Sequence, residues 1–151
     1  MQISAKTDYA VRALLMLASR SPELVKVDVL TVQQDLPRKF VEAILSEMRR
    51  AGLVVSRRGA DGGYALARPA TEITIGAVIR VVDGPLAEVR GLRPNETTYT
   101  GVAEHLPDVW VAMRAALRAV LDETTLQDVL TGKLPPHVKL MAQSPDAWLA
   151  R

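Results

Sequence analysis

The stretch LPRKFVEAILSEMRRAGLVVSRRGADGGYAL, residues 36–66, carries the clearest structural pattern in this chain of 151 residues. Its first half predicts a helix that begins at about Arg38 and ends at about Ala51. Pro37 suits a first helical turn, where no amide donor is needed, and Gly52 suits a left-handed cap after the last turn. Apolar residues recur there at helical spacing and predict the buried stripe of the helix, which consists of Phe40, Val41, Ile44, Leu45 and Met48.

The second half of this stretch predicts a β-hairpin. Two short apolar segments, 53–55 and 64–66, flank a glycine-rich tip, and apolar runs separated by turn residues are typical of paired strands. The tip carries the adjacent cations Arg57 and Arg58. Glycines let a backbone approach a DNA groove closely while arginines supply positive charge, and an ordinary hairpin turn is the alternative.

Two helices are expected before this stretch. The first spans 7–20, with Thr7 or Asp8 as its cap. A short strand over 25–27 is expected next, followed by a short second helix that Asp28 could cap. Helix, short helix, sharp turn, basic helix and basic hairpin follow one another in the order of a winged helix-turn-helix domain.

The remainder of the chain is also expected to be mainly helical. Thr74 predicts the start of a fourth helix, and a long helix with a broad apolar face is expected from about Pro107 to Glu123. The fold class is mainly α with a small β-hairpin wing (α+β). The expected organisation is a winged helix-turn-helix domain over 1–86, a loop over 87–106, a dimerisation helix with a short following helix over 107–132, and an irregular tail over 133–151.

The composition excludes several classes of chemistry. Cysteine is absent, which removes disulfides, thiol redox chemistry and cysteine-ligated metal sites. The two histidines, His105 and His137, are far apart, and no nucleophile–base set or metal cluster has suitable spacing, so an enzyme is not expected. The apolar runs are too short for a membrane span, and the N-terminus lacks the features of a signal peptide, so a cytoplasmic protein is expected.

Positive charge is concentrated in one part of the chain. Residues 38–68 hold seven basic and three acidic residues, whereas 1–37 are neutral overall and 69–151 carry a net charge of −2. A local excess of this kind is typical of a surface that binds a polyanion, and a solvated helix face is the alternative.

The basic helix could enter the major groove of DNA with its first turn nearest the base edges. Glu42 lies on that turn, and a carboxylate beside phosphates is costly unless it accepts a hydrogen bond from a base such as cytosine. Stabilisation of the helix N-terminus is the alternative role of Glu42. The expected DNA-binding residues are Arg38, Lys39, Glu42, Ala43, Arg49, Arg57, Arg58, Gly59, Asp61 and Gly62.

Three segments of the chain resemble the Rrf2 family of bacterial transcription regulators. They are ISxKxxYAxRAL over 3–14, FVExILxxMRxAGLV over 40–54 and RGADGGYxLA over 58–67. The resemblance implies a homodimer that binds a palindromic operator, in which the long helix at about 108–122 packs against its partner. The apolar face of that helix supplies the expected dimerisation residues, which are Val109, Trp110, Met113, Leu117 and Val120.

The same resemblance assigns base reading to Lys39, Glu42 and Ala43, and insertion into a groove to the wing at 58–62. Relatives often have a small polar residue in place of Lys39 and a glutamine in place of Ala43. The resemblance therefore implies the mode of docking and leaves the operator sequence open.

The chain departs from the family in the loop that corresponds to 87–105. Many relatives bind an iron–sulfur cluster there through three cysteines, and this chain has none, so we expect no cluster and no other cofactor. Asp8 matches a position from which some relatives supply a further ligand, and a helix cap is its expected role here. A sensor pocket is expected between the loop, the first helix and the long helix, with ordinary surface positions as the alternative. Its polar residues would be Asp8, Arg12, Tyr99 and His105.

These observations favour a sequence-specific DNA-binding regulator, with a repressor preferred, that places helix 38–51 in the major groove and wing 57–63 in the minor groove. Its expected partners are double-stranded DNA, a second copy of the chain and an unidentified small-molecule or protein effector, without a membrane. The alternative is a winged-helix module that binds proteins, or a regulator that a protein partner controls.

Overall fold

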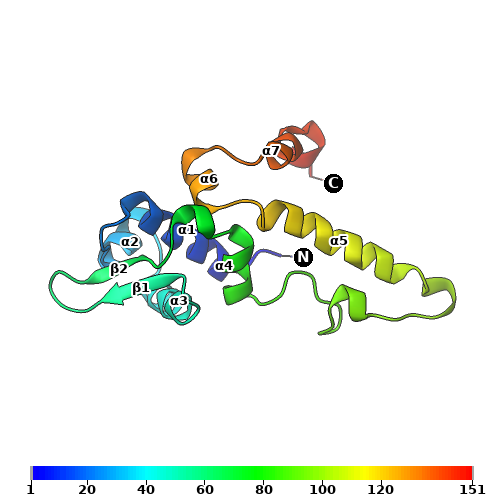
Figure 1. Ribbon diagram of the computed structural model, residues 1–151, viewed down its shortest axis with the longest axis horizontal. Helices are drawn as coiled ribbons and strands as arrows, with labels where there is room; N and C mark the ends of the chain where they lie inside the picture. The colour runs from blue at the N-terminus through cyan, green and yellow to red at the C-terminus, as the bar shows by residue number, and fades with distance from the viewer. Residues whose placement is uncertain (1, 151) are drawn as a thin grey trace.

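A computed structural model describes residues 2–150; Met1 and Arg151, which belong to the expected first domain and tail, lie outside the described residues. Within this range the fold is mainly helical with an antiparallel hairpin, as the sequence predicts (Figure 1). The helices and strands are α1 (Ala5–Arg20), α2 (Val27–Gln34), α3 (Arg38–Arg50), β1 (Val54–Arg57), β2 (Gly63–Leu66), α4 (Ile75–Val82), α5 (Leu106–Leu121), α6 (Leu126–Thr131) and α7 (Pro136–Gln143).

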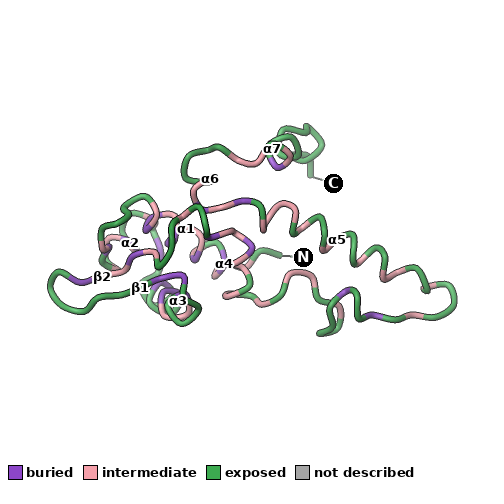
Figure 2. The backbone as a smooth tube through the Cα atoms, in the orientation of Figure 1, coloured by how far each residue is buried: buried purple, intermediate pink, exposed green. Residues whose placement is uncertain are grey.

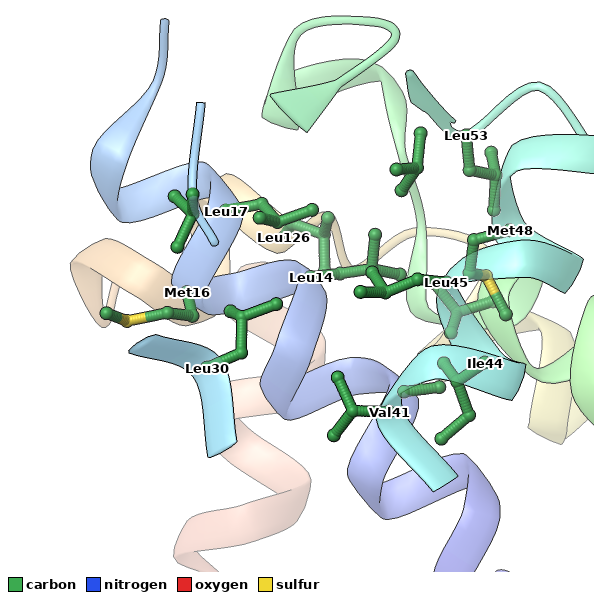
Figure 3. Close-up of a cluster of buried hydrophobic side chains, with 14 of the residues drawn as sticks. Leu14, Met16, Leu17, Leu30, Val41, Ile44, Leu45, Met48, Leu53 and Leu126 are labelled. Carbon is green, nitrogen blue, oxygen red and sulfur yellow. The ribbon is translucent and has the colours of Figure 1, made fainter. Parts of the chain in front are cut away.

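The core of the winged domain lies where α1, α2 and α3 meet (Figure 3). Its central side chains are fully buried, and each contributes about 1.5–3 kcal/mol by leaving water. They include Leu14, Leu17, Leu30, Ile44, Leu45 and Met48. Because α3 is fixed through one face, its opposite face is held at the surface.

The first two helices begin at other residues than expected. Ser4 caps α1, since its Oγ accepts a hydrogen bond from the Thr7 amide at 3.0 Å, and neither Thr7 nor Asp8 has this role. Lys26 precedes α2 without a side-chain cap, so Asp28 lies inside the first turn. An acidic residue in that turn still interacts favourably with the positive end of the helix dipole.

The hairpin is stabilised by a contact with the segment before α2. Strands β1 and β2 pair with Val54 opposite Leu66 and Arg57 opposite Gly63. The strand expected over 25–27 is reduced to a bridge, in which Val25 and Tyr64 exchange two backbone hydrogen bonds of 2.8 Å each. A Cβ at Gly63 would lie 2.7 Å from the Val25 carbonyl oxygen, so this approach requires glycine.

Helix α6 packs into the core of the winged domain. The sequence instead placed this short helix with the dimerisation helix over 107–132, outside the winged domain expected over 1–86, and that assignment is wrong. Leu126 is fully buried within the same cluster as the core residues of α1 (Figure 3). The Ile75 amide donates to the Thr124 carbonyl, and the Leu126 amide donates to the Ile73 carbonyl, both at 2.9 Å. These bonds return the chain to the start of α4 after the long helix.

Residues 84–123 leave the winged domain and return to it; we call them the arm. Residues 84–105 run outward with 3₁₀ turns at Pro94–Glu96 and Gly101–Ala103, and α5 runs back (Figure 1). All of α5 is described, and none of its residues is buried despite its many apolar side chains (Figure 2). A single chain therefore leaves the apolar face of α5 only partly covered.

The tail is not irregular, contrary to expectation. It forms α7 and a 3₁₀ turn at Pro145–Trp148, because Pro136 occupies the first helical position, where proline is tolerated. His137 Nε2 donates to the Ala119 carbonyl of α5 at 2.8 Å, and Val138 is buried. In the part of the chain that is described, no helix has the length and apolar character needed to cross a membrane.

Candidate nucleic-acid interface

Helix α3 presents a clear division between a buried and an exposed face. Its side chains at Val41, Ile44, Leu45 and Met48 are fully buried, as the predicted stripe requires. The positions expected to read bases, Lys39, Glu42 and Ala43, are exposed. The periodicity of the sequence thus predicts correctly which side of α3 could face a ligand.

Phe40 is a correction to the predicted stripe, because 52% of it is exposed. Its ring contacts Tyr9 edge to face, with ring centroids 6.1 Å apart and planes at 71°. Successive residues of a helix are about 100° apart around its axis, so Phe40, one position before the buried Val41, lies at the edge of the buried stripe. An aromatic ring therefore lies at the surface beside Lys39.

Arg38 is held between two carboxylates at the start of α3. Its Nε donates to Glu42 Oε1 at 2.9 Å, and its Nη1 pairs with Asp28 of α2. These hydrogen bonds, that to Glu42 first, raise the pKa of Arg38 above its usual value, so the guanidinium stays charged. Since the side chains of Arg38 and Glu42 are about half exposed, both remain accessible from solvent.

The wing places its cations at an exposed tip. Arg57 and Arg58 are exposed, as are Gly59 and Asp61, and none of these side chains has an ion-pair partner within residues 2–150. Gly62 is buried, and its amide donates to the Gly59 carbonyl at 3.0 Å, which closes the tip.

Two further polar contacts connect α3 to its surroundings. Arg49 Nη1 donates to Ser56 Oγ of β1 at 3.1 Å, so this expected DNA-binding residue also links the helix to the wing. Lys6 Nζ donates to Glu47 Oε1 at 2.8 Å and joins α1 to α3. The orientation of α3 relative to the wing is thus fixed by side chains at its edges as well as by the core.

Asp28 and Arg50 are absent from the predicted set but lie at this surface. Asp28 binds Arg38 across ten positions of sequence, a contact that depends on the turn between α2 and α3. Arg50 is exposed in the last turn of α3. The position of Arg50 within the basic segment 38–68 could have predicted that it lies at this surface, whereas no sequence pattern indicated Asp28.

Of the four residues expected to form a sensor pocket, Asp8 and Arg12 lie together on α1, whereas Tyr99 and His105 belong to the arm. Arg12 pairs with Asp8 at 3.3 Å and donates to the Gln34 carbonyl of α2. Tyr99 instead accepts a hydrogen bond from Trp110 at 3.3 Å, and His105 is exposed beside the outer end of α5. None of these residues lines the cavities beside α4 and α5 that the described residues form, and the sensor pocket stays a prediction.

The donor set of this chain does not fit an iron–sulfur cluster. Cysteine is absent, and within residues 2–150 no three histidine or acidic side chains gather in a way that could hold a metal ion. Asp8 is instead paired with Arg12.

A basic helix held against a core, with a charged β-hairpin beside it, defines a winged helix-turn-helix protein of the DNA-binding class. The profile of the Rrf2 family, described as "Iron-dependent Transcriptional regulator", matches residues 3–132, and the chain belongs to this family. A provisionally named HTH-type transcriptional regulator of Mycobacterium tuberculosis is 50% identical over 143 residues, which are 94% of this chain and 89% of that protein. The HTH-type transcriptional regulator CymR of Bacillus subtilis is 35% identical over 130 residues, covering 85% of this chain and 89% of CymR.

Solved structures have the same fold. The structure of CymR, the global cysteine regulator of B. subtilis, aligns with a TM-score of 0.75 and 31% identity over 88% of this chain and 98% of that one. IscR of T. potens aligns with a TM-score of 0.70 and 30% identity over the whole of this chain and 93% of its own. The relatives are transcriptional regulators, and this chain is a DNA-binding transcription regulator rather than an enzyme.

Proposed function

We propose that this protein is a repressor that binds a palindromic operator as a homodimer. The observation that carries the proposal is the exposed first turn of α3 beside a wing whose arginines have no partner within the described residues. Helix α3 enters the major groove, and the wing inserts into the adjacent minor groove. A repressor acts by occupying the operator, and this action requires only the DNA-binding surface of the protein.

The apolar face of α5 supports the homodimer. An apolar groove of about 420 Å³ lies between this face and α4. Its lining includes Ile3, Ile79, Leu86, Met113, Leu117 and Val120. An exposed apolar surface of this kind is unfavourable on a monomer, and a second α5 is a complementary cover for it. The dimer then presents two recognition helices to two half-sites about 34 Å apart.

Glu42 and Arg58 have different roles in this proposal. Glu42 lies where it can accept a hydrogen bond from a base. Its Oε1 now accepts from Arg38, so this hydrogen bond must break when Glu42 binds a base. Arg58 at the free tip of the wing supplies charge, which acts on every DNA sequence alike.

The test selects genomic DNA fragments with purified protein and footprints the tightest one. Protection of a palindrome with half-sites one helical turn apart is expected. Glu42→Ala should change the preferred bases, while Arg58→Ala should weaken all DNA and reduce the slope of log K against log salt by about 2 per dimer. Lys139→Ala in α7, exposed and far from α3 in the chain, is the matched control for loss of one charge.

Two outcomes would contradict the proposal. Equal loss of affinity on all DNA for both variants would remove base reading from Glu42. Weak binding without sequence preference, abolished by moderate salt, would favour a winged helix that serves a protein partner instead. Measured expression of the flanking genes in a deletion strain separates the roles, because loss of a repressor raises that expression.

A further inference from the structure

A cavity of about 550 Å³ lies between α4, the outgoing segment of the arm and α5. Arginines from all three segments line it: Arg80 of α4, Arg93 of the outgoing segment, and Arg114 and Arg118 of α5. No described residue of α3 or of the hairpin contributes to its wall. Its volume falls within the range of about 300–1,000 Å³ that is typical of small-molecule sites.

The charges around this cavity do not balance. Asp122 binds Arg80 through two hydrogen bonds of 2.6 and 2.8 Å and Arg118 through one of 3.3 Å, so one carboxylate serves two guanidiniums. Arg93 and the partly buried Arg114 have no ion-pair partner among residues 2–150. Glu88 is the acidic member of the cavity wall. Four guanidiniums therefore face two carboxylates, and two positive charges remain uncompensated.

We propose that this cavity binds a small organic dianion, either a dicarboxylate or a phosphate ester. A planar guanidinium forms paired hydrogen bonds with carboxylate or phosphate oxygens, which makes arginine the preferred residue for both groups. Asn95 adds an uncharged amide, and Pro85 and Leu86 supply an apolar wall for the carbon part of the ligand. Bringing four like charges to one cavity is unfavourable until an anion is bound.

Two of the four arginine side chains, and the backbone that carries a third, are held in place before a ligand binds. Arg93 precedes the 3₁₀ turn at Pro94–Glu96, in which Pro94 is buried and the Thr97 hydroxyl donates to the Pro94 carbonyl at 2.7 Å. Asp122 fixes Arg80 and Arg118. A site assembled in advance loses less conformational entropy on binding.

One strip of chain connects the cavity to the apolar groove of the proposed dimer. Residues 85–87 line both of them. A ligand that contacts this strip on one side alters the surface offered to the second copy on the other, and with it the spacing of the two recognition helices. This effector role rests on the proposed function, whereas binding of the anion does not.

Calorimetry on the DNA-free protein tests the site. Succinate and glycerol 3-phosphate are the probes, with uncharged succinamide and glycerol as controls, in a buffer free of phosphate and polycarboxylates. At least one dianion should bind with a Kd of about 1 mM or tighter, and its uncharged control should not. Arg93→Gln and Arg114→Gln should each weaken binding about tenfold or more, because each removes a charge-assisted hydrogen bond.

Arg90→Gln is the matched control, since Arg90 belongs to the same outgoing segment and lies outside the cavity wall. Binding to this variant should equal that of the unmodified chain. Equal loss in all three variants, or no heat with either dianion at concentrations up to about 10 mM, would overturn the proposal. So would loss of DNA affinity or of the dimer in Arg114→Gln without any binding of the anion, because the arginines would then contact phosphates of DNA or carboxylates of the partner.

The effector role has a separate readout. Operator affinity should change at least threefold when the bound dianion is added at constant ionic strength, and Arg114→Gln should not respond. No change would overturn the effector role. If no operator exists, the proposed function fails while the calorimetric result still decides the site.

Discussion

Gly62 lies where the wing tip folds back against β1, and its position is buried although Asp61 before it is exposed. A Cβ there would collide with the Arg57 carbonyl oxygen. The resemblance assigned this residue to the inserting wing, and the structure adds a steric reason for a glycine. The direction in which Arg57 and Arg58 leave the hairpin depends on this close approach.

Gly62→Ala should therefore impair DNA binding without unfolding the protein. We expect operator affinity to fall about tenfold, equivalent to one lost charge-assisted contact, because the tip must move away from Arg57. Fluorescence anisotropy with a labelled operator measures the affinity. Ala60→Ser is the control at the same exposed tip, and both variants should unfold within about 3 °C of the unmodified chain. Unchanged affinity in Gly62→Ala would show that the tip is not positioned by this glycine.

At the scale of single residues, the sequence predicts the exposed and buried positions of α3 better than its ion pairs. Val41 and Ile44 follow from helical periodicity, because every turn of a helix presents the same side. Phe40 does not, since an apolar residue at the edge of the stripe is buried only if a neighbouring helix covers it. The Asp28–Arg38 pair could not be predicted, because it depends on the angle of the turn between α2 and α3.

Asp122 joins two elements, α4 and α5. Two hydrogen bonds to Arg80 attach it to α4, and a Cβ at Gly76 would collide with its carboxylate, so glycine makes room for it. The Arg80 hydrogen bond lowers the pKa of Asp122 below its ordinary value of 3.8, against an opposing effect of burial. A carboxylate with a lowered pKa stabilises the fold above its unfolded pKa, and this contribution is lost as the pH falls through the folded value.

Asp122→Asn should lower the free energy of unfolding at pH 7 by about 1–3 kcal/mol, because two arginines lose their charged partner. The difference from the unmodified chain should begin to shrink below about pH 4, where this carboxyl group is protonated in the unfolded chain, and should be lost as the pH falls through the lowered pKa of the folded state. Urea denaturation across this pH range measures both. Asp61→Asn, at the exposed wing, is the control and should have no effect. A difference that stayed constant down to pH 3 would show that the charge of Asp122 is not what matters.

Leu126 makes α6 part of the winged domain, so its truncation should destabilise the whole domain. Leu126→Ala should cost about 2–5 kcal/mol, the range for buried leucines. Leu130→Ala in the same helix should cost less than about 1 kcal/mol, because Leu130 is 41% exposed. Thermal unfolding measures both variants. Equal effects would mean that α6 is not anchored through Leu126.

At the scale of elements, every predicted helix exists, and the errors concern short or long-range features. Local patterns predict a short helix that begins at Thr124 or Thr125 and ends at Gly132, and the structure has Thr125 as its cap. Its docking onto α1 joins parts of the chain more than a hundred residues apart. In the tail, Pro135 and Pro136 suggested irregular structure. Pro136 instead begins α7, since proline ends a helix only when it falls inside one.

The whole molecule has an arm whose apolar face is only partly covered by its own chain. If that face forms the dimer, Val109→Glu should convert the protein to a monomer at micromolar concentration, because it buries a charge in the interface. Val109 is 56% exposed in one chain, so the substitution should leave the fold intact. Sedimentation velocity measures the result. Ala115→Glu, on the opposite side of α5, is the control, and an unmodified chain that sedimented as a monomer would contradict the dimer.

Both ends of the arm are attached to one short element, α4. The outgoing end follows Asp83, which accepts hydrogen bonds from Ser4 and Thr7 of α1, and the returning end is held by the bonds of Asp122 and Thr124. The arm therefore leaves the domain that carries α3 and returns to it at the same element. If the arm carries the proposed effector site, an arm exchanged between relatives should bring a different chemical signal to the same set of operators.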